Sequence, residues 1–374
     1  MERILDTGPS SGPKDFQSSQ AAKLLRRYHN IALFLGGFLF DCVTIRRIDS
    51  WLDIGFQLFY LGVLGALLVF QSREAHGIWH PPAFISSLWK YNVGVLHFLY
   101  GGLLNNYVIL YFRSSSGARP FVFFLLLMIL LIINEMPYIR RFGHRMRLGL
   151  YTFCLATFMI FFVPIMAGRM GMTVFVLSLL ICGAIIWWVA GRLIPERVEK
   201  ELRMRLFIPA AGVLGIIFVL YFLRLIPPVP LSVQSQGIYH SIEKTNTGYE
   251  LAYLKPPLYL FWKSDSRPFR FRKGDLLYYW VSIFAPRNFR HRVLIRTEYF
   301  DLRSGKFVTS DTIPLNVVGG RDRGFRGFIM KSNYQAGRWR ISSETEDGRT
   351  IGFVDFDAIP DDSDAPRQWL KIVM

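Results

Sequence analysis

The pattern of apolar and polar residues changes character near residue 226. Before that point, apolar stretches close to the spanning length of about 20 residues recur along the chain. We expect seven membrane-spanning helices, at about residues 30–45, 54–70, 91–112, 120–135, 148–168, 171–190 and 206–226. The first of these segments is short and contains Asp41, which makes it the weakest of the seven.

Beyond residue 226 the chain alternates over short runs instead. In HRVLIRTEYF, Val293 and Ile295 fall on one face and Arg292 and Arg296 on the other, and GRWRISSE alternates in the same way. This period of two predicts half-buried strands. Asp347-Gly348 between two such runs predicts a hairpin. Seven to nine short strands without a convincing helix favour a C-terminal all-β, immunoglobulin-like sandwich, with a small open barrel as the alternative.

These patterns divide the chain into five parts. We expect a cytoplasmic N-terminal tail (1–29), an α-helical transmembrane domain (30–226), a Pro-rich linker (227–236), an extracytoplasmic β-sandwich (237–358) and a C-terminal tail (359–374). The tail ends either as a short strand or as a loose segment. The first thirty residues hold no apolar run, so we expect no cleaved signal peptide and an uncleaved first segment.

Basic residues predict the orientation. With the N-terminus in the cytoplasm, sixteen Lys and Arg of the membrane half fall on the cytoplasmic side and six on the other. Short loops obey this positive-inside bias, which places the C-terminal domain outside the cytoplasm. If the first segment does not span, the alternation of sides reverses.

The strong positive charge has the same origin. The chain has 44 Lys and Arg against 27 Asp and Glu, a net charge of +17, and its mean hydropathy is +0.28. After residue 227 the balance is 22 basic to 16 acidic residues, about +6. The basicity is thus mainly an orientation signal, and we expect no nucleic-acid partner. All three cysteines, Cys42, Cys154 and Cys182, fall in predicted spans, so the outer domain has no disulfide.

Two stretches carry a family resemblance. GDLLYYWVSIFAPRNFRHRVLIRTEYF and GGRDRGFRGFIMKSNYQAGRWRISSETEDGRTIGFVDF resemble the C-terminal domain of bacterial proteins grouped as a domain of unknown function, number twenty-nine-fourteen. The membrane half, in GFLFDCVTIRRID, YVILYFRSSS and IINEMPY, is similar to multi-span members. The resemblance implies a bacterial inner-membrane protein with an extracytoplasmic β domain, and it implies no activity.

Catalytic motifs are not visible. The outer domain has two histidines, His240 and His291, and we find no nucleophile elbow, metalloprotease helix or phosphate loop. We therefore expect no enzyme activity, no catalytic residue and no cofactor. His76 and His80 have a spacing that could bind a metal, but Pro81 and Pro82 end any helix there, so we favour an interfacial loop and no metal.

Polar residues inside the predicted spans allow two interpretations. They are Asp41, His97, Asn105, Asn106 and Glu135. Ionisable groups at membrane depth are costly, and His97 with Glu135 could line a proton or solute path. Helix packing through small and amide side chains is the interpretation that we favour. Asp41, a few residues from Arg46 and Arg47, would then form an ion pair that fixes the first hairpin.

The stretch GGRDRGFRGF, residues 319–328, joins four glycines to three arginines. We expect the glycines to form a turn or bulge. If 324–331 pairs as a hairpin with 337–344, the arginines gather into a candidate anion or partner site, since guanidinium groups bind carboxylates and phosphates in bidentate fashion. This tentative site consists of Arg321, Arg323, Arg326, Arg338 and Arg340. The alternative is a set of solvated arginines on an outer face.

Together these observations predict a multi-pass protein of the bacterial inner membrane. Its N-terminus would lie in the cytoplasm and its periplasmic β-sandwich would act as a binding or scaffolding module. The partner would be an envelope protein, a lipid headgroup or a wall polymer. The alternative is a transporter or channel-like protein that uses the polar groups of the third and fourth spans.

Overall fold

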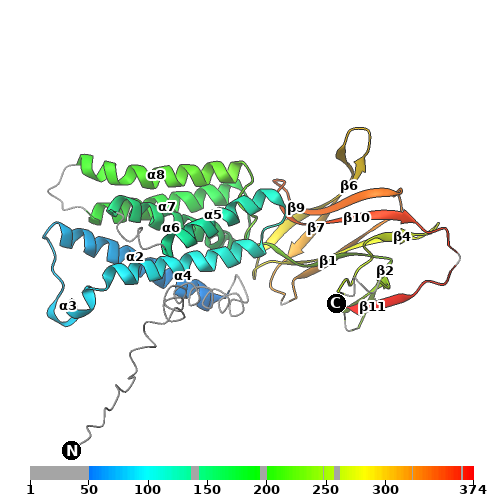
Figure 1. Ribbon diagram of the computed structural model, residues 1–374, viewed down its shortest axis with the longest axis horizontal. Coiled ribbons are helices and arrows are strands. Elements are labelled where there is room, and N and C mark those ends of the chain that lie inside the picture. The colour runs from blue at the N-terminus through cyan, green and yellow to red at the C-terminus, as the bar shows by residue number, and fades with distance from the viewer. Residues whose placement is uncertain are drawn as a thin grey trace, which may run out of the picture. The chain divides into compact units, whose positions relative to one another are not determined.

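The computed structural model describes residues 50–135, 143–193, 200–246, 248–256, 262–321, 323–363 and 365–374 (Figure 1). The chain divides into two units, Met1–Arg46 and Arg47–Met374, and all of the described helices and strands belong to the second. The first predicted span, with Asp41, lies outside the described residues.

The first half of this unit is helical. Its helices are α2 (Trp51–Ala75), α3 (Ala83–Trp89), α4 (Asn92–Arg113), α5 (Ala118–Glu135), α6 (His144–Ala167), α7 (Met172–Leu193) and α8 (Lys200–Phe222). α2 begins where the Ser50 hydroxyl accepts a hydrogen bond from the Asp53 amide at 3.4 Å. α6 ends at Gly168, whose φ of 66° lets the chain leave the helix.

The predicted count of seven spans is too high for the residues that the structure describes. Four helices, α2, α4, α6 and α7, are long and apolar enough to cross a membrane by length and composition. The continuous apolar parts of α5 and α8 are shorter, at 118–134 and 207–222.

The long helices lie side by side and are tied together at one end by polar groups (Figure 1). The Ser72 hydroxyl of α2 donates to the Leu193 carbonyl of α7 at 2.8 Å. Gln71 of α2 donates to Asn92 of α4 at 3.0 Å. The ends of α2 and α7 and the start of α4 therefore meet.

The second half is rich in sheet, as the alternating pattern predicts. Its strands are β1 (Ser232–Tyr239), β2 (Ser241–Thr245), β3 (Gly248–Leu254), β4 (Phe269–Phe271), β5 (Leu277–Phe284), β6 (Arg290–Asp301), β7 (Lys306–Val318), β8 (Phe325–Lys331), β9 (Gly337–Thr345), β10 (Thr350–Pro360) and β11 (Trp369–Val373). They form three sheets, ordered β1-β5-β8, β4-β10-β9-β6-β7 and β11-β3-β2. The last strand lies in the segment expected as the C-terminal tail, so that segment pairs with β3.

One core joins the first two sheets. Tyr279 and Val281 of β5 are buried with Val293 and Ile295 of β6 and with Ile341 of β9. Val293, Ile295 and Ile341 are the apolar positions of the alternating runs, and the predicted hairpin at Asp347-Gly348 is confirmed as the β9–β10 connection. Gly348 there has a φ of 76°, which a side chain would oppose.

The predicted pairing of 324–331 with 337–344 is wrong. β8 pairs with β5, while β9 pairs with β10 and β6 in a different sheet. The Ser-Asn-Tyr-Gln-Ala-Gly connection looks locally like a hairpin loop, but it carries the chain from one sheet to the other. Tyr334 in this connection donates to the Asp275 carbonyl at 2.7 Å and packs on the core.

Candidate functional site

The glycine-rich corner, residues 319–324, is a place of close backbone approach. The Gly319 amide donates to the Phe289 carbonyl at 2.8 Å, and the Gly320 amide to the Ala285 carbonyl at 3.2 Å. A Cβ at Gly319 would collide with the backbone carbonyl of Pro286. Gly320 and Gly324 adopt φ values of 87° and 70°. Glycine is thus required in this corner by sterics and backbone conformation.

The structure does not assemble the five predicted arginines into one cluster. Arg326 lies on β8, where it donates to the Met374 carbonyl at 2.9 Å and sits over the Tyr249 ring. Arg340, on β9, makes a bidentate pair with Asp355 at 2.6 and 2.7 Å. Arg338 approaches the same carboxylate at 3.6 Å. The two β9 arginines are therefore neutralised on their own sheet.

Arg321 and Arg323 lie elsewhere, beside two further arginines. We define the basic corner as Arg287, Arg290, Arg321 and Arg323, all of them exposed. The Arg287 side chain runs alongside Gly320, and the Arg321 guanidinium lies 5.2 Å from the Phe325 ring centre. Among the described residues, no carboxylate forms an ion pair with any of the four.

The basic corner adjoins the helices. The Arg290 amide donates to the Gly168 carbonyl, in the turn between α6 and α7, at 3.1 Å. A cavity of about 590 Å³ opens beside this contact, lined by Arg287 and Asn288 on one side and by Trp51 and Met166 on the other. Guanidinium groups beside an apolar wall suit a phosphate or carboxylate that is attached to an apolar body.

A second contact fixes the sheet to the helices. Arg349, in the β9–β10 turn, is only 5% exposed, and its guanidinium lies 3.5 Å from the ring centre of Tyr221 in α8. It donates to Asp347 at 2.6 Å. The Tyr221 ring in turn stacks on Phe175 of α7. A buried cation on an aromatic face is a directional contact, so it sets the orientation of the turn on α8.

The polar residues of the predicted spans have separate positions. His97 of α4 and Asn134 of α5 hydrogen-bond through Nδ1 and Oδ1 at 3.1 Å, and the Asn134 amide donates to the His97 carbonyl at 3.0 Å. Asn105 is buried in α4 and Asn106 is half-buried next to it. Glu135 is the last residue of α5. The described contacts of His97 thus join α4 to α5.

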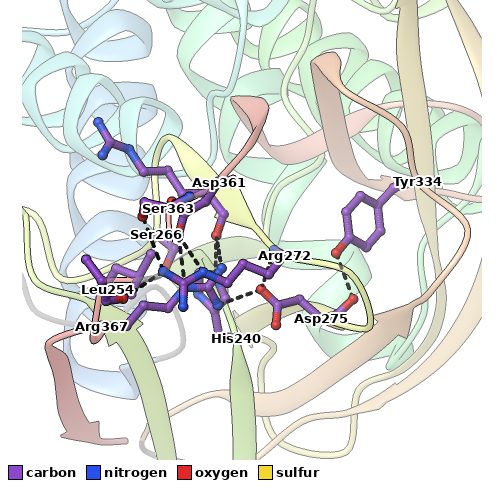
Figure 2. A network of polar contacts seen from close by, with 11 residues as sticks. His240, Leu254, Ser266, Arg272, Asp275, Tyr334, Asp361, Ser363 and Arg367 are labelled. Atoms are coloured by element: carbon purple, nitrogen blue, oxygen red, sulfur yellow. Dashed lines mark hydrogen bonds and ion pairs between the residues drawn. The ribbon is translucent and has the colours of Figure 1, made fainter.

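His240 belongs to a polar network at the end of the sheet (Figure 2). Its ring bonds the Ser266 hydroxyl at 3.0 Å and the Arg270 carbonyl at 2.9 Å, and stacks on Phe269. Burial lowers the pKa of His240, which favours the neutral ring. The network fixes the segment that leads into β11, and its members bond to one another, which is a structural role.

Ion pairs complete this network (Figure 2). Arg367 contacts Asp275 at 2.6 Å and Asp361 at 3.3 Å, and Arg272 contacts Asp361 at 2.9 Å. A hydrogen bond from Ser363 and the two arginines lower the pKa of Asp361 to about 2. The carboxylate therefore stays ionised at any ordinary pH.

His291 and His76 have separate surroundings in the described part of the chain. Burial lowers the pKa of His291 at the start of β6. His76 bonds the Ser72 carbonyl at 2.7 Å, and the nearby Glu74 accepts from Trp89 at 2.6 Å. Within the described part of the chain, no group of three or more His, Cys, Asp or Glu could hold a metal ion.

Sequence reasoning missed four residues that make these contacts. Asp355, Asn134, Tyr221 and Arg349 each act through a partner distant in the chain. The alternation around GFVDFD puts Asp355 of β10 on the same face of the sheet as the arginines of β9. This signal could have predicted its pair with Arg340. No local pattern marks Tyr221 or Arg349 as a contact.

Comparisons with known proteins bear on the C-terminal region. Residues 299–358, from β6 to β10, match the family described as "Protein of unknown function (DUF2914)", which confirms the resemblance of this region. The match does not include the helices, and the family's description names no reaction. No curated protein matches the chain.

One solved structure is similar over much of the chain. It is the alkylpurine DNA glycosylase AlkC of Pseudomonas fluorescens bound to DNA containing an abasic site analog. The similarity covers 84% of this chain and 100% of that one, at 8% identity and a TM-score of 0.20. A similarity this low carries no argument about fold or function.

Proposed function

We propose that the chain is an integral protein of the bacterial inner membrane that presents its sheet region to the periplasm as a binding or scaffolding module. The apolar helices would lie in the bilayer. The first two sheets, which share one core, would form a sandwich of immunoglobulin-like class. The module would recognise an anionic group through the basic corner.

The distribution of basic residues supports this orientation. Among the described residues, the helix ends and connections away from the strands hold most of the Lys and Arg of the bundle: Arg73, Lys90, Arg145, Arg147, Arg192, Lys200, Arg203 and Arg205. The connections at the strand end hold Arg113, Arg119, Arg169 and Arg224. With the segment 30–45 as a span, this bias favours a cytoplasmic position for the first end.

The observation that carries the proposal is the contact of Arg349 with Tyr221. A module on a loose tether would expose such a turn to water. Burial of this arginine against α8, together with the hydrogen bond from Arg290 to Gly168, supports a module held at a fixed orientation above the bilayer. The basic corner would then face anionic groups close to the membrane surface.

Charge removal at the basic corner tests the proposal. The full chain in phosphatidylcholine nanodiscs would be compared with a variant carrying Arg287→Gln, Arg321→Gln and Arg323→Gln. One arm measures co-sedimentation with purified sacculi, and the other measures retention of added phosphatidylglycerol by native mass spectrometry. We expect the variant to lose more than about tenfold in affinity in the arm that supplies the true ligand.

A matched control removes three exposed charges elsewhere, with Lys273→Gln, Arg303→Gln and Lys306→Gln. This control should bind like the unaltered chain. The arm in which the basic-corner variant loses affinity shows whether the ligand is a wall polymer or a lipid headgroup. Binding in neither arm, or an equal loss in both triple variants, would refute a role for the basic corner.

The alternative, a transporter or channel-like protein, has weaker support. A solute path needs a polar lining through the bilayer. The cavity beside His97 is walled mainly by apolar side chains such as Leu126, Phe153 and Val213.

A further inference from the structure

The helical region holds a cavity of about 480 Å³ that has no part in the proposed binding at the basic corner. Its walls come from four helices, α4, α5, α6 and α8. Leu130 and Ile133 of α5 face Phe153 of α6 and Val213 of α8 across it. The volume falls within the range of about 300–1,000 Å³ typical of small-molecule sites.

The cavity arises from the way that the helices pair. α5 packs on α4, and α8 packs on α6. Among the described helices, no close backbone pairing joins α5 to α6 or α8. Gly149 of α6 widens the gap, because a Cβ built on it would meet no atom within 4 Å. An apolar space of this kind in a bilayer favours an apolar occupant.

One end of the cavity is basic. Arg145 and Arg147, in the first turn of α6, belong to its lining. Arg147 donates to Gln71 at 2.8 Å, and Gln71 is itself held by Asn92. The Tyr100 hydroxyl donates to the Arg147 carbonyl at 2.7 Å. Gln71 of α2 thus positions the Arg147 guanidinium, Tyr100 of α4 holds the Arg147 backbone, and the positive end of the α6 dipole adds to the field.

We propose that this cavity binds an anionic amphiphile, with its acyl chain between α5 and α8 and its phosphate or carboxylate at Arg145 and Arg147. The apolar walls match a hydrocarbon chain. The two guanidinium groups match an anionic head, which accepts paired hydrogen bonds from them. The His97–Asn134 pair lies in the same lining, where its mutual hydrogen bonds let it border an apolar chain at low cost.

The site makes two separable demands on its ligand. The chain must fit the space beside Gly149, and the head must carry negative charge. Dioleoyl phosphatidylglycerol meets both demands, whereas dioleoyl phosphatidylcholine has the same chains on a head without net charge. This pair of lipids therefore measures the contribution of the head alone.

The test uses the full chain in detergent, titrated with each of the two lipids and followed by native mass spectrometry. We expect phosphatidylglycerol to bind about tenfold more tightly than phosphatidylcholine. Gly149→Leu places a side chain in the cavity, where its Cβ meets no atom within 4 Å, and should weaken binding of both lipids. Gly212→Leu in α8 is the matched control, because Gly212 also has open space around it, is exposed and does not line the cavity.

Arg145→Gln tests the head group separately. It should bring the affinity for phosphatidylglycerol down towards that for phosphatidylcholine, while phosphatidylcholine, which has no net charge, should lose less affinity. A phosphatidylglycerol with a photoactivatable acyl chain should cross-link to the segment around Leu130 or Val213 in the unaltered protein. It should not do so in the Gly149→Leu variant. Equal affinity of the unaltered chain for both lipids, or equal losses in the Gly149→Leu and Gly212→Leu variants, would overturn the proposal.

Discussion

The two ends of the five-stranded sheet are built in different ways. At the end that meets the helices, the β9–β10 turn buries Arg349 against Tyr221, and the glycine-rich corner packs backbone against backbone. At the opposite end, Leu302 in the β6–β7 turn is 89% exposed, and charged side chains around His240 pair near the surface.

The β9–β10 turn and the β6–β7 turn each contain a glycine with a left-handed backbone conformation. Gly348 and Gly305 each adopt a positive φ, of 76° and 64°. What differs is the neighbour that each turn meets, since Gly348 lies against Arg224 and Gly305 has open space around it. Turn chemistry therefore determines that a hairpin forms, while its contacts determine whether the hairpin anchors the domain. Substitutions at the two ends test this difference.

Loss of Arg349 should have the largest effect. Arg349→Gln removes a buried cation from the Tyr221 face and from its pair with Asp347. We expect the free energy of unfolding to fall by about 3 kcal/mol, the lower end for a broken buried pair, because Asp347 remains partly hydrated. Thermal unfolding of the detergent-solubilised chain measures this. Arg303→Gln in the opposite turn is the control and should change little.

Substitution in the glycine-rich corner should come next. Gly319→Ala forces a methyl group onto the Pro286 carbonyl, so strands β7 and β8 must shift. We expect a loss of about 2 kcal/mol in the free energy of unfolding. Gly305→Ala meets no neighbour and should cost about 1 kcal/mol, from its left-handed backbone alone. Equal losses at both positions would mean that the corner is not closely packed.

Acidification should loosen the outer end of the sheet, where His240 lies. Burial holds the pKa of His240 below its usual 6.5, so the fold prefers the neutral ring. The resulting stability is present above about pH 6.5 and is lost as the pH falls below it. Asp361, with its pKa at about 2, stays ionised in this range.

Hydrogen exchange of the Trp369–Val373 amides, corrected for intrinsic rates, measures that loosening. Exchange should be faster at pH 5.5 than at pH 7.5 in the unaltered chain, and His240→Gln should remove the difference. A pH dependence that persists in His240→Gln would assign the effect to another group.

The exposed turn should be the most tolerant position. Leu302→Gln is expected to change the free energy of unfolding by less than about 0.5 kcal/mol, since the side chain makes no buried contact. A clear loss in stability would show that the β6–β7 turn is covered in the folded protein.

Local patterns were sufficient for much of the fold. The alternation at Val293 and Ile295, the apolar stretches of α6 and α7, and the Asp347-Gly348 turn each predicted the element that forms. These local patterns failed to predict which strands pair when the strands are distant in the sequence. The pairing of β8 with β5 depends on a core shared by two sheets, and this is why the predicted arginine cluster does not assemble.

The candidate sites were harder to predict than the elements. Arg321 and Arg323 were recognised by type, but their companions Arg287 and Arg290 come from the β5–β6 connection and the start of β6, which only the fold brings near. The cavity beside His97 depends on how four helices pair, and no periodicity within one helix encodes that.

The central claim is that the sheet region stands outside the cytoplasm, opposite the basic helix connections. Its most direct test is labelling by a membrane-impermeant thiol reagent in intact cells with a permeabilised outer membrane. Two variants with one introduced cysteine each, Leu302→Cys and Ile78→Cys, would be compared in a Cys42→Ser background, where the remaining Cys154 and Cys182 are buried. We predict that position 302 reacts at once and position 78 reacts only after lysis. Labelling at position 78 but not at position 302 in intact cells would contradict the account.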